Sequence, residues 1–237
     1  VEIITTGPVV DNTVFALDGG SCSDDFGSFS VDGPFDIEMV TTTISPLFTG
    51  VFDDLGVLYA ADTSVDQLIT INPATGTETV VGPFTNLVAG EGMSGLAWNR
   101  DDQTMYAYST NLSSSTLYTL DATTGTLTVV GTSSLVLGVW LAIDNDGNAY
   151  TMSIDDDSLY SVNLLDGSTT LIGPTGISSN FAQDADFDSD SGILYAGIYT
   201  GGGVNQFASI DTATGVATVL GTVNSDCAEL TVVAIKG

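Results

Sequence analysis

Short runs of alternating apolar and polar residues recur along this chain. The stretch LYTLDATTGTLTVVG at 117–131 has close counterparts at 68–82, 159–173 and 207–221. Each contains an alternating run, a polar turn with a glycine, and a second run that ends in glycine. A period of two residues indicates a β-strand, and glycine readily takes the positive φ of a tight turn. Each stretch therefore predicts a pair of strands joined by a turn, and no segment shows a sustained helical period.

Two further apolar runs precede each of these pairs. The first reads GVFDD at 50, GLAWN at 95, WLAID at 140 and DADFD at 184, and the second carries one aromatic residue at a fixed place. Four strands in a unit of about 40 to 50 residues are the signature of a β-propeller. The sequence predicts an all-β, single-domain, five-bladed propeller over residues 13–237. One aromatic per blade predicts packing between blades rather than a sugar-binding surface: Phe15, Tyr59, Tyr106, Tyr150 and Tyr195.

The order of the runs predicts how the ring closes. The chain starts with a run of the second type, TVFALD at 13, and ends with one of the first type, LTVVAI at 230. We therefore expect the C-terminal strand to complete the first blade. Cys22 and Cys227 would then lie in loops on the same rim, and we expect a disulfide between them, worth about 4–5 kcal/mol in the chain-entropy model. Such a bond indicates an oxidising compartment, whereas the alternative is two buried free thiols.

Residues 1–12 are left over once twenty strands are assigned. They form an extra strand or arm, VEIITTGPVV and two further residues. It either adds an edge strand to its own propeller or pairs with an exposed edge of a neighbouring molecule. The second alternative makes the apolar positions candidate subunit contacts: Val1, Ile3, Ile4, Val9 and Val10.

The units LYxxDxxTGxxTxVG and GLAxxxDGxxYA resemble the repeats of secreted bacterial and archaeal β-propeller proteins. They are more loosely similar to blades of the NHL and WD40 types, although the WD dipeptide itself is absent. The resemblance covers everything except about the first ten residues, and it implies the propeller fold. It implies no activity, because propellers serve as lectins, glycosidases, scaffolds and adhesins alike.

The charge balance excludes some partners. The chain has 30 acidic residues, no histidine and two basic residues, Arg100 and Lys236, which gives a net charge of −28. Nucleic acids and anionic membrane surfaces bind basic patches, so neither is an expected partner. No apolar run approaches the 18 residues of a membrane span. The chain begins at Val1 rather than Met, as a processed secreted protein would, and we expect an extracellular or cell-surface location.

The lack of histidine also excludes Ser-His-Asp and Cys-His catalysis. Carboxylates remain, and a glycosidase needs two of them close together. The candidates are three acids in an inner strand, with Asp53 and Asp144 at strand ends. Arginine and histidine, which commonly hold sugar hydroxyls, are almost missing, so we expect no enzymatic activity. The inner-strand candidates are Asp184, Asp186 and Asp188.

Two acidic patterns could bind calcium. Alternate acids in a tight loop can supply three of the six to eight oxygens that calcium takes. Ala149 stands where an EF-hand loop would have its turn glycine, and the competing interpretation is a solvated turn. No other cofactor is expected. Asn111 begins a lone N-glycosylation sequon. The possible ligands are Asp144, Asp146 and Asn148 in one pattern, and Asp184, Asp186, Asp188 and Asp190 in the other.

Three functions are compatible with these features. The first is a non-enzymatic extracellular structural protein that assembles with itself, as a filament or surface layer, through its N-terminal strand. The second is an extracellular binding module, such as a glycan-binding lectin or an adhesin. The third is a carboxylate-based glycosidase. We favour the first, although a high net charge keeps molecules apart and must be overcome in any assembly.

Overall fold

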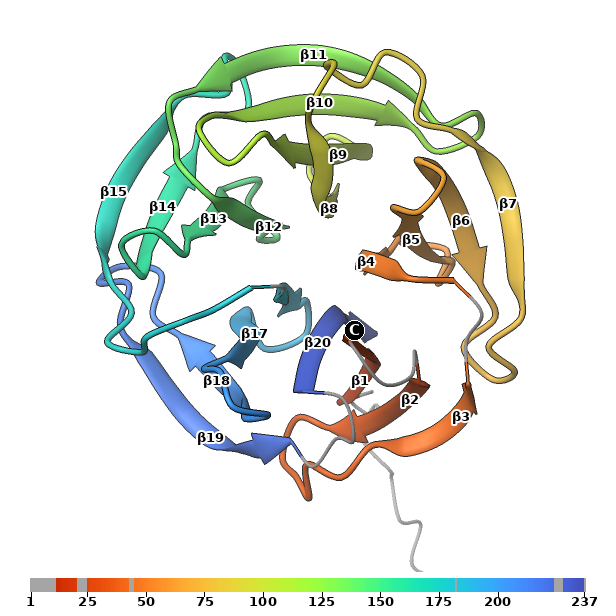
Figure 1. Ribbon diagram of the computed structural model, residues 1–237, viewed down its shortest axis with the longest axis vertical. Coiled ribbons are helices and arrows are strands. Elements are labelled where there is room, and N and C mark those ends of the chain that lie inside the picture. The colour runs from red at the N-terminus through yellow and green to blue at the C-terminus, as the bar shows by residue number, and fades with distance from the viewer. Residues whose placement is uncertain (1–11, 21–24, 43–44, 182, 224–227, 237) are drawn as a thin grey trace, which may run out of the picture.

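The predicted five-bladed propeller is confirmed. The computed structural model describes residues 12–20, 25–42, 45–181, 183–223 and 228–236. These residues form five antiparallel sheets of four strands each, arranged as a ring around a central axis (Figure 1). No helix long and apolar enough to cross a membrane occurs among them. The innermost strands are β20 (Ala228–Lys236), β4 (Leu47–Phe52), β8 (Gly92–Asn99), β12 (Gly138–Ile143) and β16 (Asp184–Asp188).

The C-terminal strand closes the ring, as the sequence predicts. Strand β20 pairs with β1 (Thr13–Gly20), and β2 (Asp25–Ser30) and β3 (Glu38–Thr42) complete this first blade. The pairing runs from Thr13 opposite Lys236 to Gly20 opposite Ala228. Cys22 and Cys227 lie outside the described residues, so the disulfide stays a prediction. The paired residues Gly20 and Ala228 are their nearest described neighbours along the chain.

The other four blades follow one another in chain order. In each, the last two strands are the predicted repeated pair. The second blade adds β5 (Leu58–Asp62), β6 (Gln67–Ile71) and β7 (Glu78–Pro83) to β4. The third adds β9 (Thr104–Thr110), β10 (Ser115–Asp121) and β11 (Thr126–Ser133) to β8. The fourth adds β13 (Ala149–Ser153), β14 (Ser158–Val162) and β15 (Thr169–Pro174) to β12. The fifth adds β17 (Ile193–Tyr199), β18 (Asn205–Ile210) and β19 (Ala217–Val223) to β16.

The repeated glycines are explained by contacts between blades. Gly125, in the turn between β10 and β11, has a φ of 78°. A Cβ atom on it would lie 2.7 Å from the carbonyl oxygen of Gly82 in the preceding blade. A Cβ on Gly82 would in turn lie 2.2 Å from the carbonyl oxygen of Thr124. Two glycines thus let the backbones of adjacent blades touch, which explains why the same glycine spacing recurs in the repeat units.

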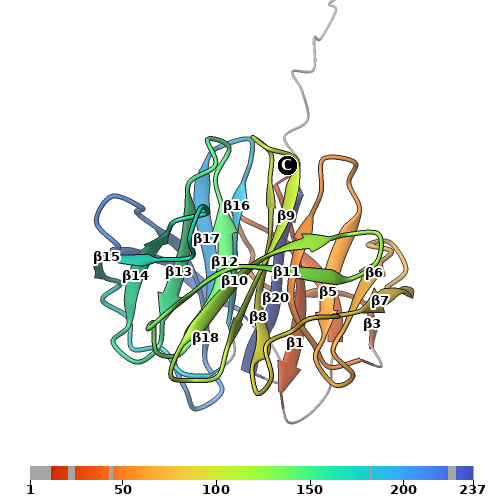
Figure 2. The same cartoon turned by 90° about the horizontal axis from the view of Figure 1, so that it is seen from above.

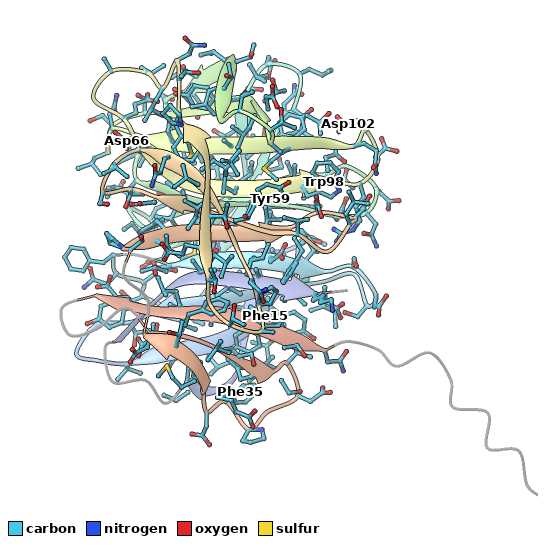
Figure 3. The ribbon with its side chains drawn as sticks, turned by 90° about the vertical axis from the view of Figure 1, so that its right-hand side faces the viewer. Phe15, Phe35, Tyr59, Asp66, Trp98 and Asp102 are labelled. Carbon is cyan, nitrogen blue, oxygen red and sulfur yellow. The ribbon has the colours of Figure 1, made fainter. Side chains whose placement is uncertain are left out.

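The same contact recurs around part of the ring. Gly131 faces Gly167, and Gly173 faces Gly215. A Cβ atom on the turn glycine Gly167 would lie 2.6 Å from the carbonyl oxygen of Gly131, and one on Gly215 would lie 2.3 Å from that of Gly173. Phe35 of the first blade (Figure 3) takes the place of the turn glycine at the junction with the fifth blade. Its ring lies 2.3 Å from the Cβ position of Gly221. The first blade is therefore the one whose sequence departs from the repeat.

The apolar core is divided among the junctions between blades. The described residues form five clusters of buried side chains, and one of the five aromatics of the second strands belongs to or packs against each cluster. Tyr59 and Trp98, which lie between the second and third blades, pack against the same cluster (Figure 3). Trp140 is fully buried at the junction of the fourth and fifth blades. The aromatics therefore pack between blades, as their spacing predicts.

Candidate binding site at one end of the central axis

The two ends of the propeller differ in chemistry. We call the end where the five innermost strands begin the entry end, and the end where they finish the exit end. In Figure 3 the entry end lies on the left, on the side of Asp66, and the exit end lies on the right, on the side of Asp102. Each end has a pocket next to the axis, and the larger pocket is at the entry end.

The pocket at the entry end, here called the apolar mouth, has a volume of about 700 Å³. Residues at or just before the starts of all five innermost strands contribute to it, together with the loops that follow β9 and β13. Pockets of this size accept small molecules or a few side chains of a partner. Its lining residues are Phe48, Gly92, Met93, Ser94, Thr110, Leu112, Leu137, Val139, Ile154, Ser179, Asn180, Phe181 and Glu229.

Three of the apolar side chains of the mouth sit on unusual backbone. Leu112, Leu137 and Phe181 have φ values of 72°, 48° and 46°. Bulky residues rarely adopt the left-handed region, and such strain tends to gather at functional sites. Leu112 and Phe181 are also 62% and 66% exposed. The fold therefore holds large apolar side chains at the rim of this pocket despite the local cost of the backbone conformation.

The polar groups of the mouth are few, and several are already engaged. Glu229 is the one ionisable side chain among the described lining residues. It is half-buried, and burial raises the pKa of its carboxyl group. The hydroxyl of Ser179 donates to Asp157 Oδ1 at 2.6 Å, and the backbone amide of Asn180 donates to the backbone carbonyl of Tyr199 at 2.8 Å. The mouth thus favours an apolar occupant with few charges.

Below the mouth, Asp184 ties the innermost strands together across the axis. Its carboxylate accepts hydrogen bonds from Thr49 Oγ1 at 3.1 Å, from the Gly50 amide at 3.0 Å and from the Val233 amide at 2.9 Å. Thr49 Oγ1 also accepts the Leu96 amide at 2.9 Å. Asp184 is fully buried, and burial raises its pKa well above the usual value of 3.8. Four blades meet at this one carboxylate and its threonine partner.

Asp186 lies two residues after Asp184 in β16. It accepts the amides of Ile235 and Phe187, each at 2.9 Å. Burial raises its pKa to about 7, and the nearby charge of Asp188 adds to this rise. The hydrogen bonds from the two backbone amides and the positive charge of Arg100 lower the pKa in part. Arg100 and Lys236 both line the pocket of about 300 Å³ at the exit end, where Arg100 Nε lies 3.2 Å from Asp54 Oδ1.

The predicted carboxylate candidates have backbone partners. Asp53 accepts the Leu55 and Val57 amides at 2.9 and 2.8 Å, and Asp144 accepts the Asp146 and Asn148 amides at 3.0 and 2.8 Å. These two residues therefore shape the turns after β4 and β12. Asp184, the most central candidate, is fully buried. Its carboxylate cannot contact a substrate in this conformation.

The predicted calcium ligands do not form one type of loop. Asp144, Asp146 and Asn148 share the turn between β12 and β13, whereas Asp184, Asp186 and Asp188 lie within β16. Asp188 accepts the Asp190 amide at 3.0 Å and the hydroxyl of Ser191. Within the described part of the chain no group of three or more acidic, histidine or cysteine side chains could share a metal ion. Calcium binding stays a prediction.

Two other predicted sites stay predictions. Asn111 lies in the loop between β9 and β10, where its Oδ1 accepts the amides of Ser113 and Ser114 at 3.0 and 2.9 Å. Its glycosylation is untested. The candidate assembly residues, from Val1 to Val10, lie outside the described residues.

The apolar mouth itself was missed by sequence reasoning. Its residues come from all five blades, in runs of at most three consecutive residues. Their one local signal was a large apolar side chain within a polar loop, as in TNLSSS and SSNFAQ.

The comparison with solved structures supports the fold. The chain is similar to a chain in the nidogen–laminin complex, with a TM-score of 0.61 and 13% identity over 94% of this chain and 97% of that one. It is also similar to TolB from Acinetobacter baumannii, with a TM-score of 0.56 and 14% identity over 92% of this chain and 54% of that one. A third similar structure is the PQQ-bound aldose sugar dehydrogenase from Streptomyces coelicolor, with a TM-score of 0.53 and 14% identity over 77% of this chain and 69% of that one. No protein-family model and no curated protein matches the sequence.

At identities this low the similarity concerns the propeller fold alone. The structural neighbours are bacterial propeller proteins and others, and they include both binding proteins and enzymes. A propeller is a common scaffold for unrelated functions. The function of this chain must therefore be argued from its own residues.

Proposed function

We propose that this protein is a non-enzymatic extracellular structural protein whose copies assemble into a filament or surface layer through the N-terminal segment. The observation that carries the proposal is the completeness of the ring. All five blades have their four strands from residues 13–236, including the strand that closes the first blade. Residues 1–10, with five apolar side chains and one charge, are thus not needed for any blade.

The charge of the molecule constrains how copies can join. At a net charge of −28 two propellers repel each other. This repulsion is screened over about 8 Å at physiological ionic strength. A contact between copies must therefore be apolar and carry few acids. The segment VEIITTGPVV, with Glu2 as its one acid, fits that requirement, and so does the apolar mouth, with Glu229 as its one described acid.

The state of the carboxylates supports a non-enzymatic role. A glycosidase needs one carboxyl group to donate a proton and a second to act as nucleophile or base, both in contact with the sugar. Asp184 and Asp186 have raised pKa values because they are buried, and backbone amides of other strands occupy their oxygens. Their arrangement fits a role in holding the innermost strands together.

Self-assembly is tested by electron microscopy and light scattering of the whole chain and of a variant that lacks residues 1–10. We expect ordered polymers from the whole chain and single particles from the deletion variant. The deletion leaves every blade intact, so its circular dichroism spectrum should match that of the whole chain. A variant with Ile3 and Ile4 replaced by Ser keeps the segment but removes apolar contacts, and we expect it to assemble poorly. Single particles from the unmodified chain would refute the proposal.

The second candidate is an extracellular binding module. The apolar mouth favours it, because a pocket of about 700 Å³ rimmed by exposed Leu112 and Phe181 would suit a small apolar molecule better than a glycan. Titration of the deletion variant with an apolar fluorescent probe tests this candidate. Saturable binding at one site in a protein that never assembles would favour it over the structural role.

A further inference from the structure

We propose that the apolar mouth of one copy receives residues 1–10 of a second copy, so that propellers join head to tail. This inference rests on the proposed self-assembly and adds the surface that accepts the segment. The first step is the position of the segment. Strand β1 begins at Thr13, which pairs with Lys236 at the exit end. The mouth lies at the opposite, entry end, where Glu229 lines it near the start of β20. Figure 2 shows β1 and β20 side by side, running between the two ends.

The second step is that the segment cannot reach the mouth of its own molecule. Twelve residues before Thr13 span at most about 40 Å when fully extended. The axis is closed by Asp184 and its partners Thr49, Gly50 and Val233. A path around the outside must cross the blade, run the length of the nine-residue β20 and return to the axis, which takes more than about 50 Å at ordinary strand spacing and rise. The mouth is therefore accessible to this segment only from another copy.

The third step is that the two surfaces match in chemistry. Five of the ten residues of the segment are Val or Ile, and one is charged. The mouth exposes Leu112 and Phe181 at its rim and has Glu229 as its one acid among the described lining residues. Burial already raises the pKa of the Glu229 carboxyl group. Between molecules that otherwise repel each other, this is a place where close contact costs little electrostatic energy.

The fourth step is that the mouth is a single site. The outermost strands also present apolar side chains, such as Val80, Val129 and Leu171, at equivalent places on several blades. A segment that paired with an outer edge would therefore find several equivalent acceptors, and assemblies would branch. One mouth and one segment at opposite ends make a heterologous contact, which generates an unbranched filament or a ring.

The test uses variants of the whole chain. Leu112→Asp and Phe181→Asp together add charge to the rim at positions whose side chains are exposed and whose positive φ suits Asp better than Leu or Phe. The matched control is Leu165→Asp, at an 89% exposed position in the turn between β14 and β15. In light scattering we expect the control to polymerise like the parent, and the double variant to need a more than tenfold higher concentration.

A peptide with the sequence VEIITTGPVV supplies an independent readout. We expect it to bind the 1–10 deletion variant with one peptide per propeller, and to lose at least tenfold in affinity when Leu112→Asp and Phe181→Asp are added. Normal polymers from the double variant would overturn the mouth as acceptor and leave self-assembly standing, with a strand edge as the remaining acceptor. Single particles from the unmodified chain, together with no binding of the peptide, would overturn both proposals.

Discussion

The glycine contacts between blades make one quantitative prediction, which concerns Gly131→Ala. A Cβ atom at this position would lie 1.8 Å from the carbonyl oxygen of Asp166 and 2.6 Å from its carbonyl carbon. Both atoms belong to the backbone of the next blade, so no side chain can rotate away. The junction between the third and fourth blades must open by more than about 1 Å to reach ordinary van der Waals separation.

The size of the effect follows from this geometry. Overpacking a well-ordered contact costs about 1–3 kcal/mol, and backbone pressed on backbone belongs at the upper end of that range. For a domain of this size each kcal/mol lowers the melting temperature by about 2–4 °C. We therefore expect Gly131→Ala to lower it by about 6–12 °C.

The assay is thermal unfolding followed by circular dichroism, with both variants made in the chain that lacks residues 1–10, so that assembly adds no stability. The matched control is Gly92→Ala. It is also a strand glycine outside the left-handed region, and no heavy atom lies within 4 Å of its Cβ position. We expect its stability to change by less than about 0.5 kcal/mol. If Gly131→Ala melts within about 2 °C of Gly92→Ala, the repeated glycines do not set the distance between blades.

Three further predictions concern the acids and the cysteines. Because burial raises the pKa of Asp186 to about 7, its protonated form stabilises the fold at low pH, and the free energy of unfolding should fall as the pH rises from about 4 to about 7. A pKa shift of this size corresponds to at most about 4 kcal/mol in the free energy of unfolding. In urea unfolding at several pH values, Asp186→Asn should reduce the dependence of this free energy on pH. An unchanged dependence would mean that other groups cause it. If Cys22 and Cys227 are bonded, the intact mass should rise by two hydrogens on reduction and the melting temperature should fall; no mass change would mean free thiols. If the turn at Asp144 and Asp146 binds calcium, the heat of binding in a calorimetric titration with calcium should vanish when Asp144→Asn and Asp146→Asn are combined. Equal heats in the parent and this double variant would place the ion elsewhere.

The fold could be predicted from the sequence because each blade repeats the same local problem. Four of the five units repeat an alternating strand pair with a glycine in its turn, and all five carry an aromatic for the junction, so the signal appears several times over. The closure of the ring was also predictable, since the chain starts with a strand of the second type, TVFALD, and ends with LTVVAI, the strand of the first type that the first blade would otherwise lack. The two glycines of each repeated stretch were visible in the sequence, but the contact between Gly82 and Gly125 that explains them was not.

The candidate site could not be predicted in the same way. The mouth gathers residues that differ from blade to blade, such as Phe48, Leu112 and Phe181, and no repeat marks them. In the sequence, the acids of DADFDSDSG fitted a polar turn better than a calcium site, and nothing there shows that amides from β4 and β20 surround Asp184. Long-range partners decided the role of each of these side chains.

The most direct test of head-to-tail assembly is a mixing experiment between two variants that each lack one half of the contact. One lacks residues 1–10 and keeps the mouth, and the other keeps the segment and carries Leu112→Asp and Phe181→Asp. Sedimentation velocity should show each variant alone as a single chain, and an equimolar mixture should form a particle of twice that mass and nothing larger. A mixture that stays monomeric, at a concentration where the unmodified chain forms polymers, would contradict the account.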